Sequence, residues 1–152
     1  DSVIDGRSVY RARKELGVKL ADLDVPQNSV VTGMPDSGTL AALGFAQKAG
    51  LPFEMGIVRN RYVGRTFIQP TQLVRDIGVK IKLNPQRTAF MGREAVVIDD
   101  SLVRGTTAGR IISMIRESGA KKVHLRIASP PVCFPCADGH PVPLQKDRGR
   151  FP

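Results

Sequence analysis

The stretch VVIDDSLVRGTT, residues 96–107, decides how the rest of the chain is interpreted. It opens with branched apolar residues typical of a buried strand and continues with two adjacent carboxylates, Asp99 and Asp100. Neighbouring acids repel each other, and burial at a strand end removes part of their hydration. A cation or a hydroxyl-rich ligand beside them would offset that cost. The stretch therefore predicts a ligand site where a buried strand ends.

The segments on either side alternate between strand and helix patterns. Short segments rich in apolar residues predict strands over residues 29–32, 53–58, 95–98 and 123–128. Helical spacing of apolar residues and turn residues predict helices over residues 6–20, 39–48 and 108–118. Asp5 is the expected cap of the first helix. Strands that alternate with helices predict an α/β fold, a parallel sheet with helices on both faces.

Composition limits the class of protein. The 152 residues, 41% of them hydrophobic, suit one globular domain. The chain has no apolar run of about 20 residues and no signal peptide, so we expect a soluble, cytoplasmic protein with no membrane partner. Because it begins at Asp1 rather than at a methionine, we expect a piece of a longer protein. The net charge of +9 favours an anionic partner: a nucleic acid, a phosphorylated metabolite or an acidic protein surface.

Two segments do not follow the alternation of predicted strands and helices. Residues 59–93 hold eight basic residues and one acidic residue, which predicts either a lid or small subdomain or a solvated basic insertion. Residues 137–152 are polar, contain prolines and lack periodicity, which predicts an irregular tail.

Two loops should meet at the carboxyl edge of the sheet, where ligands of such folds bind. The first, TGMPDSG (residues 32–38), has glycines that permit close backbone approach, and a helix N-terminus follows it. Asp36 and Ser37 in this loop are either ligand-binding residues or helix caps. The second loop, DDSLVRGTT (residues 99–107), combines paired acids with the hydroxyls and backbone amides of a phosphate cradle. Together they predict a phosphorylated ribose, with Mg²⁺ sharing its oxygens.

The second loop, with the strand before it, resembles the phosphoribosyl pyrophosphate signature of type I phosphoribosyltransferases. RNRYVGRTFIQP (residues 59–70), with VTGMPDSG before it and ASPPVCFPC (residues 128–136) after it, resembles the glutamine phosphoribosyl pyrophosphate amidotransferases, also called amidophosphoribosyltransferases. The resemblance runs from about Ser2 to Cys136. It implies a partial type I phosphoribosyltransferase domain over residues 1–136, with a mobile basic loop inserted, and a tail over residues 137–152 that departs from the family pattern.

The resemblance assigns site residues by position. Metal-binding positions for Mg²⁺ fall on Ser37, Asp99 and Asp100. Substrate-binding positions form a larger set from both loops: Asp36, Ser37, Gly38, Asp99, Asp100, Ser101, Val103, Arg104, Gly105, Thr106 and Thr107. Catalytic positions lie in the loop that closes over substrate: Arg59, Arg61, Tyr62 and Arg65. The family commonly has lysine where this chain has Arg59, which keeps the charge and changes the geometry.

The family reaction implied is displacement of pyrophosphate from phosphoribosyl pyrophosphate by ammonia, which gives 5-phosphoribosylamine and opens purine synthesis. The ammonia comes from glutamine through a glutaminase domain that this chain lacks. Purine nucleotides are the implied inhibitors, and the intact enzyme is expected to be a homo-oligomer. Some members carry a 4Fe–4S cluster; Cys136 matches one ligand position and Cys133 does not, so we expect a cluster in the intact protein only.

Two other functions remain open at this stage. A nucleobase phosphoribosyltransferase would share the signature, although it needs a hood for a flat base and the chain is only 5% aromatic. A phosphoribosyl pyrophosphate sensor that binds nucleic acid would use the net charge of +9. Ammonia needs no catalytic base, so His124 is interpreted as a structural residue.

Overall fold

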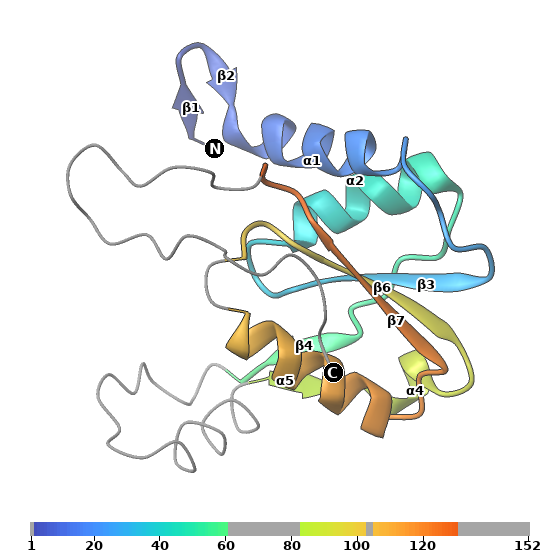
Figure 1. The fold of residues 1–152 in the computed structure, drawn as a ribbon. Helices are drawn as coiled ribbons and strands as arrows, with labels where there is room; N and C mark the ends of the chain where they lie inside the picture. The colour runs from blue at the N-terminus through green and yellow to red at the C-terminus, as the bar shows by residue number, and fades with distance from the viewer. Residues whose placement is uncertain (1, 61–82, 103–104, 131–152) are drawn as a thin grey trace, which may run out of the picture.

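The centre of the molecule is a three-stranded parallel sheet with strand order β3-β6-β7 (Figure 1). The computed structural model describes residues 2–60, 83–102 and 105–130. Strand β3 (Ser29–Gly33) pairs with β6 (Glu94–Asp99), and β6 pairs with β7 (Lys122–Ile127). These three strands were predicted within one or two residues, and the parallel arrangement is confirmed.

Alternating side chains of β3 and β6 form two cores, one on each face of the sheet. On one face, Val31, Val96 and Ile98 pack with Phe45 of α2 (Thr39–Ala49). Helix α1 (Val9–Leu20) packs on α2 on the same side. Every one of those core side chains is fully buried, which contributes about 1.5–3 kcal/mol per side chain.

The opposite face of the sheet is covered by α5 (Thr106–Glu117). Its Ile111 and Ile115 pack with Val30 and Val97 of the sheet, as the apolar spacing predicted. Phe90 of the short helix α4 (Arg87–Phe90) completes this core. With helices on both faces, the predicted α/β sandwich is confirmed (Figure 1).

The predicted start of the first helix is wrong. Residues 2–8 form a small antiparallel hairpin, β1 (Val3–Ile4) with β2 (Arg7–Ser8), and α1 begins at Val9. Ser8 caps the helix, because its hydroxyl accepts the amide of Arg11 at 3.3 Å. Asp5 lies in the hairpin turn at φ 50° and caps nothing there, since its position is outside the helix.

The predicted strand over residues 53–58 is also only partly correct. Phe53 makes a single parallel bridge with Val31, and the chain then leaves the central sheet. It forms β4 (Ile57–Arg59), which pairs antiparallel with β5 (Leu83–Pro85) in a separate two-stranded sheet. Strand β4 ends at the first residue of the basic segment of residues 59–93, and β5 lies within that segment. Most of that segment, residues 61–82, lies outside the described residues, as do residues 131–152 with both cysteines and the predicted tail.

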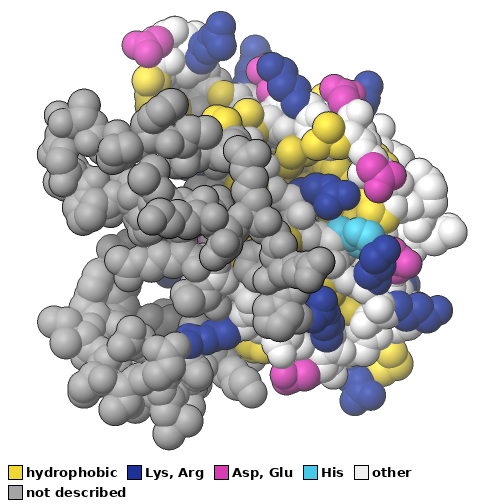
Figure 2. Space-filling model, in the orientation of Figure 1, with side chains coloured by type: hydrophobic (Ala, Val, Ile, Leu, Met, Phe, Trp, Pro, Cys, Tyr) yellow, Lys and Arg dark blue, Asp and Glu magenta, His cyan; other side chains and the backbone are white. Residues whose placement is uncertain are grey.

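Among the described residues, no helix has the length and apolar character needed to cross a membrane. On the face seen in Figure 2, lysine and arginine side chains are interspersed with acidic ones over the described surface, rather than gathered into one patch.

Candidate functional site

The two predicted loops meet at the carboxyl ends of β3 and β6. The backbone amide of Met34 donates to the carbonyl of Ile98 at 2.8 Å, so the first turn begins directly against the end of β6. Gly38 closes that turn, with its amide donating to the carbonyl of Met34 at 2.9 Å. A Cβ on Gly38 would lie only 3.1 Å from the Cα of Asp99. Glycine is required here because the two loops are in backbone contact.

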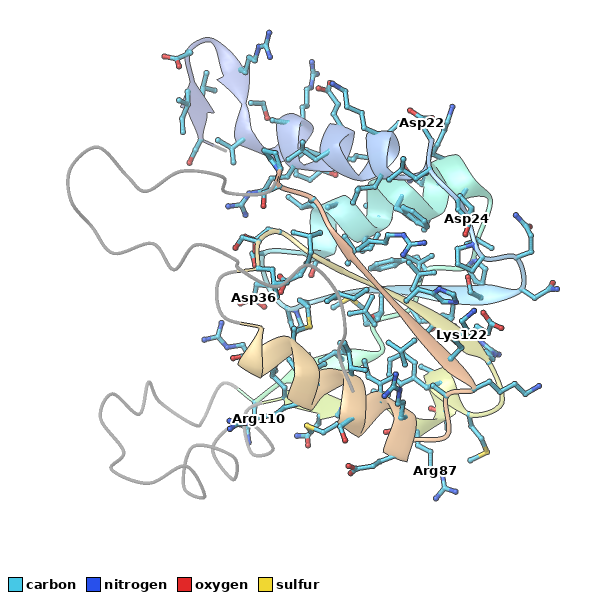
Figure 3. All side chains as sticks on the ribbon, viewed as in Figure 1. Asp22, Asp24, Asp36, Arg87, Arg110 and Lys122 are labelled. Atoms are coloured by element: carbon cyan, nitrogen blue, oxygen red, sulfur yellow. The ribbon has the colours of Figure 1, made fainter. Side chains whose placement is uncertain are left out.

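The first turn presents Asp36 and Ser37 at this edge. Asp36 is exposed, Ser37 is partly buried, and the peptide bond between Pro35 and Asp36 is cis. Helix α2 begins immediately after Gly38, which has no side chain to cap it. In Figure 3, Asp36 and Lys122 lie on opposite sides of the molecule. Lys122 is the first residue of β7 and so marks the amino end of that strand.

The acid pair occupies the end of β6. Both Asp99 and Asp100 are partly buried, and the Asp99 carboxylate accepts the amide of Asp100 at 2.9 Å. The Ser101 hydroxyl donates to the Asp100 carboxylate at 3.2 Å. Burial raises the pKa of Asp99 from 3.8 to about 6; the Asp100 charge adds to this rise and the Asp100 amide opposes it. The surroundings of Asp99 therefore disfavour its charged form, and such raised pKa values are common at functional sites.

Two residues that the sequence interpretation missed hold this pair in place. The amides of Ala128 and Ser129 donate to the carbonyls of Asp99 and Asp100, each at 2.9 Å. The parallel ladder between β6 and β7 thus continues past the end of both strands. The predicted strand over residues 123–128 ends at Ala128 and Ser129 follows it, and this position was the only signal in the sequence.

The start of α5 lies where the phosphate cradle is predicted. Gly105 adopts φ 71°, a left-handed conformation that favours glycine, and its lack of a side chain leaves the helix without a side-chain cap from that position. Thr107 is exposed in the first turn. Three predicted side chains of this loop lie outside the described part: those of Val103, Arg104 and Thr106.

Arg59 joins the site from a third part of the chain. It is the last residue of β4, and its guanidinium donates to the Asp36 carboxylate at 3.1 Å. Both side chains are largely exposed, so this ion pair contributes little stability. The other predicted catalytic positions, Arg61, Tyr62 and Arg65, and the cluster ligand Cys136 lie outside the described residues.

The donors present fit Mg²⁺ only in combination with a ligand. Asp99 and Asp100 supply carboxylate oxygens, which Mg²⁺ prefers. However, no group of three or more His, Cys, Asp or Glu residues suited to a metal occurs among the described residues. Mg²⁺ commonly takes one or two carboxylates together with substrate phosphate oxygens rather than an all-protein cage. The acid pair suits that second arrangement.

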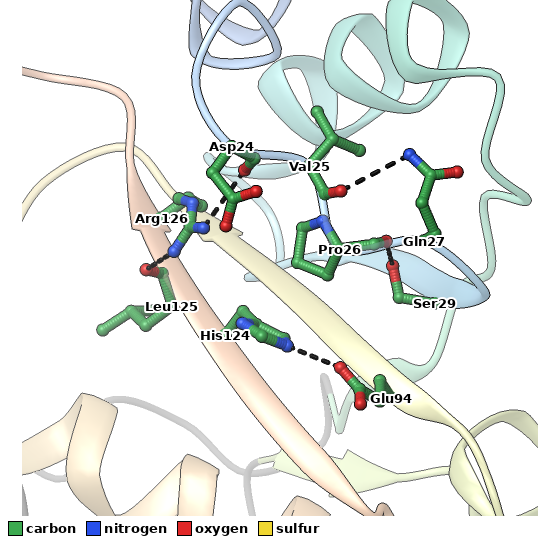
Figure 4. Close-up of polar contacts among 9 residues, drawn as sticks. All are labelled: Asp24, Val25, Pro26, Gln27, Ser29, Glu94, His124, Leu125 and Arg126. Carbon is green, nitrogen blue, oxygen red and sulfur yellow. Dashed lines mark hydrogen bonds and ion pairs between the residues drawn. The ribbon is translucent and has the colours of Figure 1, made fainter.

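His124 lies away from this edge. It is mostly buried in β7 and contacts the carboxylate of Glu94 in β6 at 2.8 Å, which lowers the pKa of Glu94 (Figure 4). Nearby, Arg126 donates to the carbonyls of Leu125 and Asp24 at 3.4 and 3.3 Å. These contacts tie strands and connections together, in agreement with a structural role for His124.

Comparison with solved structures defines the class of fold. No family model matches the chain. A structure described as the allosteric regulatory enzyme of purine biosynthesis and one of Bacillus subtilis glutamine phosphoribosylpyrophosphate amidotransferase with ADP and GMP both superimpose with a TM-score of 0.80. Each is 52% identical over 90% of this chain and is itself covered to 29% or 30%. The fold is that of a type I phosphoribosyltransferase.

Sequence comparison identifies relatives of the chain. The chain is 50% identical over 147 residues to the chloroplastic amidophosphoribosyltransferase of Glycine max and 52% identical over 139 residues to that of Bacillus subtilis. These alignments cover 97% and 91% of this chain. Over most of its length, the chain is therefore similar to part of the amidophosphoribosyltransferases. It spans 26% and 29% of the lengths of those two relatives, about a quarter.

Proposed function

We propose that this segment binds Mg²⁺–phosphoribosyl pyrophosphate at the carboxyl edge of the sheet and transfers the phosphoribosyl group to ammonia. The observation that carries the proposal is the partly buried acid pair at the end of β6, in backbone contact with the turn of residues 34–38. Such a pair suits vicinal ribose hydroxyls and a shared cation, and the glycine-led start of α5 suits a phosphate. The similarity to amidophosphoribosyltransferases supports the same substrate.

The proposed reaction requires little acid–base catalysis from the residues of the chain. The bond from the anomeric carbon to pyrophosphate breaks, a bond to the ammonia nitrogen forms, and that nitrogen then loses a proton. Mg²⁺ would neutralise the negative charge of the departing pyrophosphate. Asp99 and Asp100 hold the ribose and the cation, while Arg59, with its guanidinium beside the turn of residues 34–38, is placed to stabilise the leaving group.

The wider assignments belong to the whole protein and are part of the same proposal. The proposed domain spans residues 1–136. The ammonia is derived from glutamine, purine nucleotides inhibit, the intact enzyme is a homo-oligomer of the cytoplasm, and Cys136 serves a 4Fe–4S cluster. Arg61, Tyr62, Arg65, Val103, Arg104, Thr106 and Thr107 complete the proposed site together with the positions described above.

The test measures pyrophosphate release from phosphoribosyl pyrophosphate by the purified chain with Mg²⁺ and ammonia. We expect release that requires ammonia and is lost in the Asp99→Asn, Asp100→Asn double variant. The matched control is Asp22→Asn, Asp24→Asn, which removes the same charge from exposed positions away from Asp36 (Figure 3). Release with uracil, hypoxanthine or orotate in place of ammonia would establish a nucleobase transferase instead.

A further inference from the structure

A buried hydrogen bond joins Thr32 to Gly56, a few residues before Asp36 and Arg59 respectively. Thr32 is a fully buried residue of β3, and its hydroxyl oxygen accepts the backbone amide of Gly56 at 3.2 Å. This bond joins the strand that leads into the turn of residues 34–38 to the segment that leads into β4. No sequence pattern marked it, because Thr32 looks like an ordinary strand residue.

Backbone hydrogen bonds before and after Gly56, and the ring of Phe90, hold its backbone in place. Before it, the chain follows β3: the amide of Glu54 donates to the carbonyl of Val31 at 2.9 Å. After it, the chain diverges to pair with β5, and the carbonyl of Gly56 accepts the amide of Gln86 at 2.7 Å. A Cβ on Gly56 would lie 2.5 Å from the Phe90 ring, so the backbone itself packs against that ring.

The Thr32 hydroxyl therefore replaces a backbone acceptor where the ladder with β3 ends. A buried amide without a partner is costly, so this hydroxyl fixes where β4 begins. Arg59 follows Gly56 by three residues, at the end of a strand too short to absorb a change of register. Asp36 follows Thr32 by four residues, beyond the turn's first bond to β6.

We propose that Thr32 is a positioning residue that places Arg59 against the turn of residues 34–38 and so sets the affinity for the pyrophosphate group. The effect on affinity rests on the proposed function. The placement of Arg59 does not, and it is open to a separate measurement.

The experiment compares Thr32→Val, which removes the acceptor at similar volume, with Thr32→Ser, which keeps it. Ser29→Ala is the matched control, because Ser29 is a buried hydroxyl residue of the same strand whose bond, to the carbonyl of Pro26 at 2.7 Å, lies at the other end. If the valine variant does not fold, Thr32→Ala takes its place.

Two readouts are taken. The first is the Nε–Hε magnetic resonance signal of Arg59, assigned by its loss in Arg59→Lys and calibrated by its displacement in Asp36→Asn. The second is the dissociation constant of Mg²⁺–phosphoribosyl pyrophosphate, measured by calorimetry. We expect Thr32→Val to displace the signal as Asp36→Asn does and to weaken binding about tenfold, the ratio expected when the ligand loses one charge-assisted hydrogen bond, here from Arg59. The serine and Ser29→Ala variants should stay within about twofold of the parent chain.

An undisplaced Arg59 signal in Thr32→Val, or equal displacement in Ser29→Ala, would overturn the inference. If Thr32→Val displaces the Arg59 signal but leaves the affinity for Mg²⁺–phosphoribosyl pyrophosphate unchanged, the proposed effect on pyrophosphate binding is wrong. If the parent chain binds no phosphoribosyl pyrophosphate, the proposed function fails for this chain, and the Arg59 signal alone decides whether Thr32 places that residue.

Discussion

Asp99 carries a charge that its surroundings disfavour. Burial raises its pKa to about 6, so between the unfolded value of 3.8 and about 6 the folded state binds more protons than the unfolded state. Stability attributable to this group therefore falls as the pH rises through that window. Above about pH 6 the full cost of an ionised Asp99 is present. The group proposed to hold a cation thus reduces the stability of the free protein.

Replacing Asp99 with Asn should stabilise the free protein at neutral pH. Because Asp99 is only partly buried, the gain is about 1 kcal/mol after solvent screening, or about 3 °C in Tm for a chain of this size. The gain should disappear below about pH 4, where the carboxyl is protonated in both states. Thermal unfolding in metal-free buffer at several pH values measures it. A gain that persists unchanged at low pH would show that the charge is not its cause.

Individual residues were predictable where a local rule governs them. Gly38, Gly50 and Gly105 were placed at turns and helix ends, and the structure has them there. Asp5 and Ser8 are both good helix caps, and nothing in the local sequence chooses between them. The choice depends on the hairpin of residues 3–8, whose two-residue strands pair through the backbone.

At the scale of elements, α1 and α2 approach each other through glycine. A Cβ on Gly17 of α1 would lie 2.6 Å from the carbonyl carbon of Ala41 and 2.8 Å from its Cα. Gly44 of α2 meets the backbone of Lys14 in the same way. Both glycines lie within helices, where glycine costs about 1 kcal/mol relative to alanine, so the close packing of the two backbones must offset that cost.

Gly17→Ala should therefore destabilise the protein despite the better helix propensity of alanine. Overpacking against backbone atoms that cannot move aside should lower the free energy of unfolding by about 1–3 kcal/mol. Gly109→Ala in α5 is the control, since no described atom lies within 4 Å of its added Cβ, and it should gain about 0.5–1 kcal/mol. Urea unfolding of both variants compares them. Equal gains would mean that the two helices can move apart at little cost.

The elements that could be predicted share a local signal. Strands β3 and β6 contain apolar runs, and β7 alternates apolar with basic or histidine residues. Helices α2 and α5 have helical apolar spacing with glycine near their ends. For β4, only Ile57 and Val58 were part of a predicted strand, and β5 had no such signal. The two strands pair with each other across a long intervening segment. The chain's departure from β3 after Phe53 depends on the buried link at Gly56, which no periodicity encodes.

At the scale of the whole molecule, the site draws on parts of the chain far apart in sequence. The meeting of the 34–38 turn with the acid pair was predictable, because the carboxyl ends of parallel strands share one edge. The contact between Arg59 and Asp36 was not, since it depends on where β4 leaves the sheet. Because the site combines residues at or just after the ends of β3, β6 and β4, a bound ligand should hold these strands together and stabilise the whole fold.

Mg²⁺–phosphoribosyl pyrophosphate should accordingly raise the thermal stability of the chain. At a hundred times its dissociation constant, a ligand that binds only the folded state adds about 2.7 kcal/mol, which corresponds to about 5–10 °C in Tm here. The Asp99→Asn, Asp100→Asn variant should show no such rise, whereas Asp22→Asn, Asp24→Asn should respond as the parent chain does. Differential scanning calorimetry measures the shift, with inorganic phosphate and Mg²⁺ at the same concentrations as the reference. An equal rise with phosphate would mean that the edge binds any phosphate and that the acid pair does not recognise the ribose.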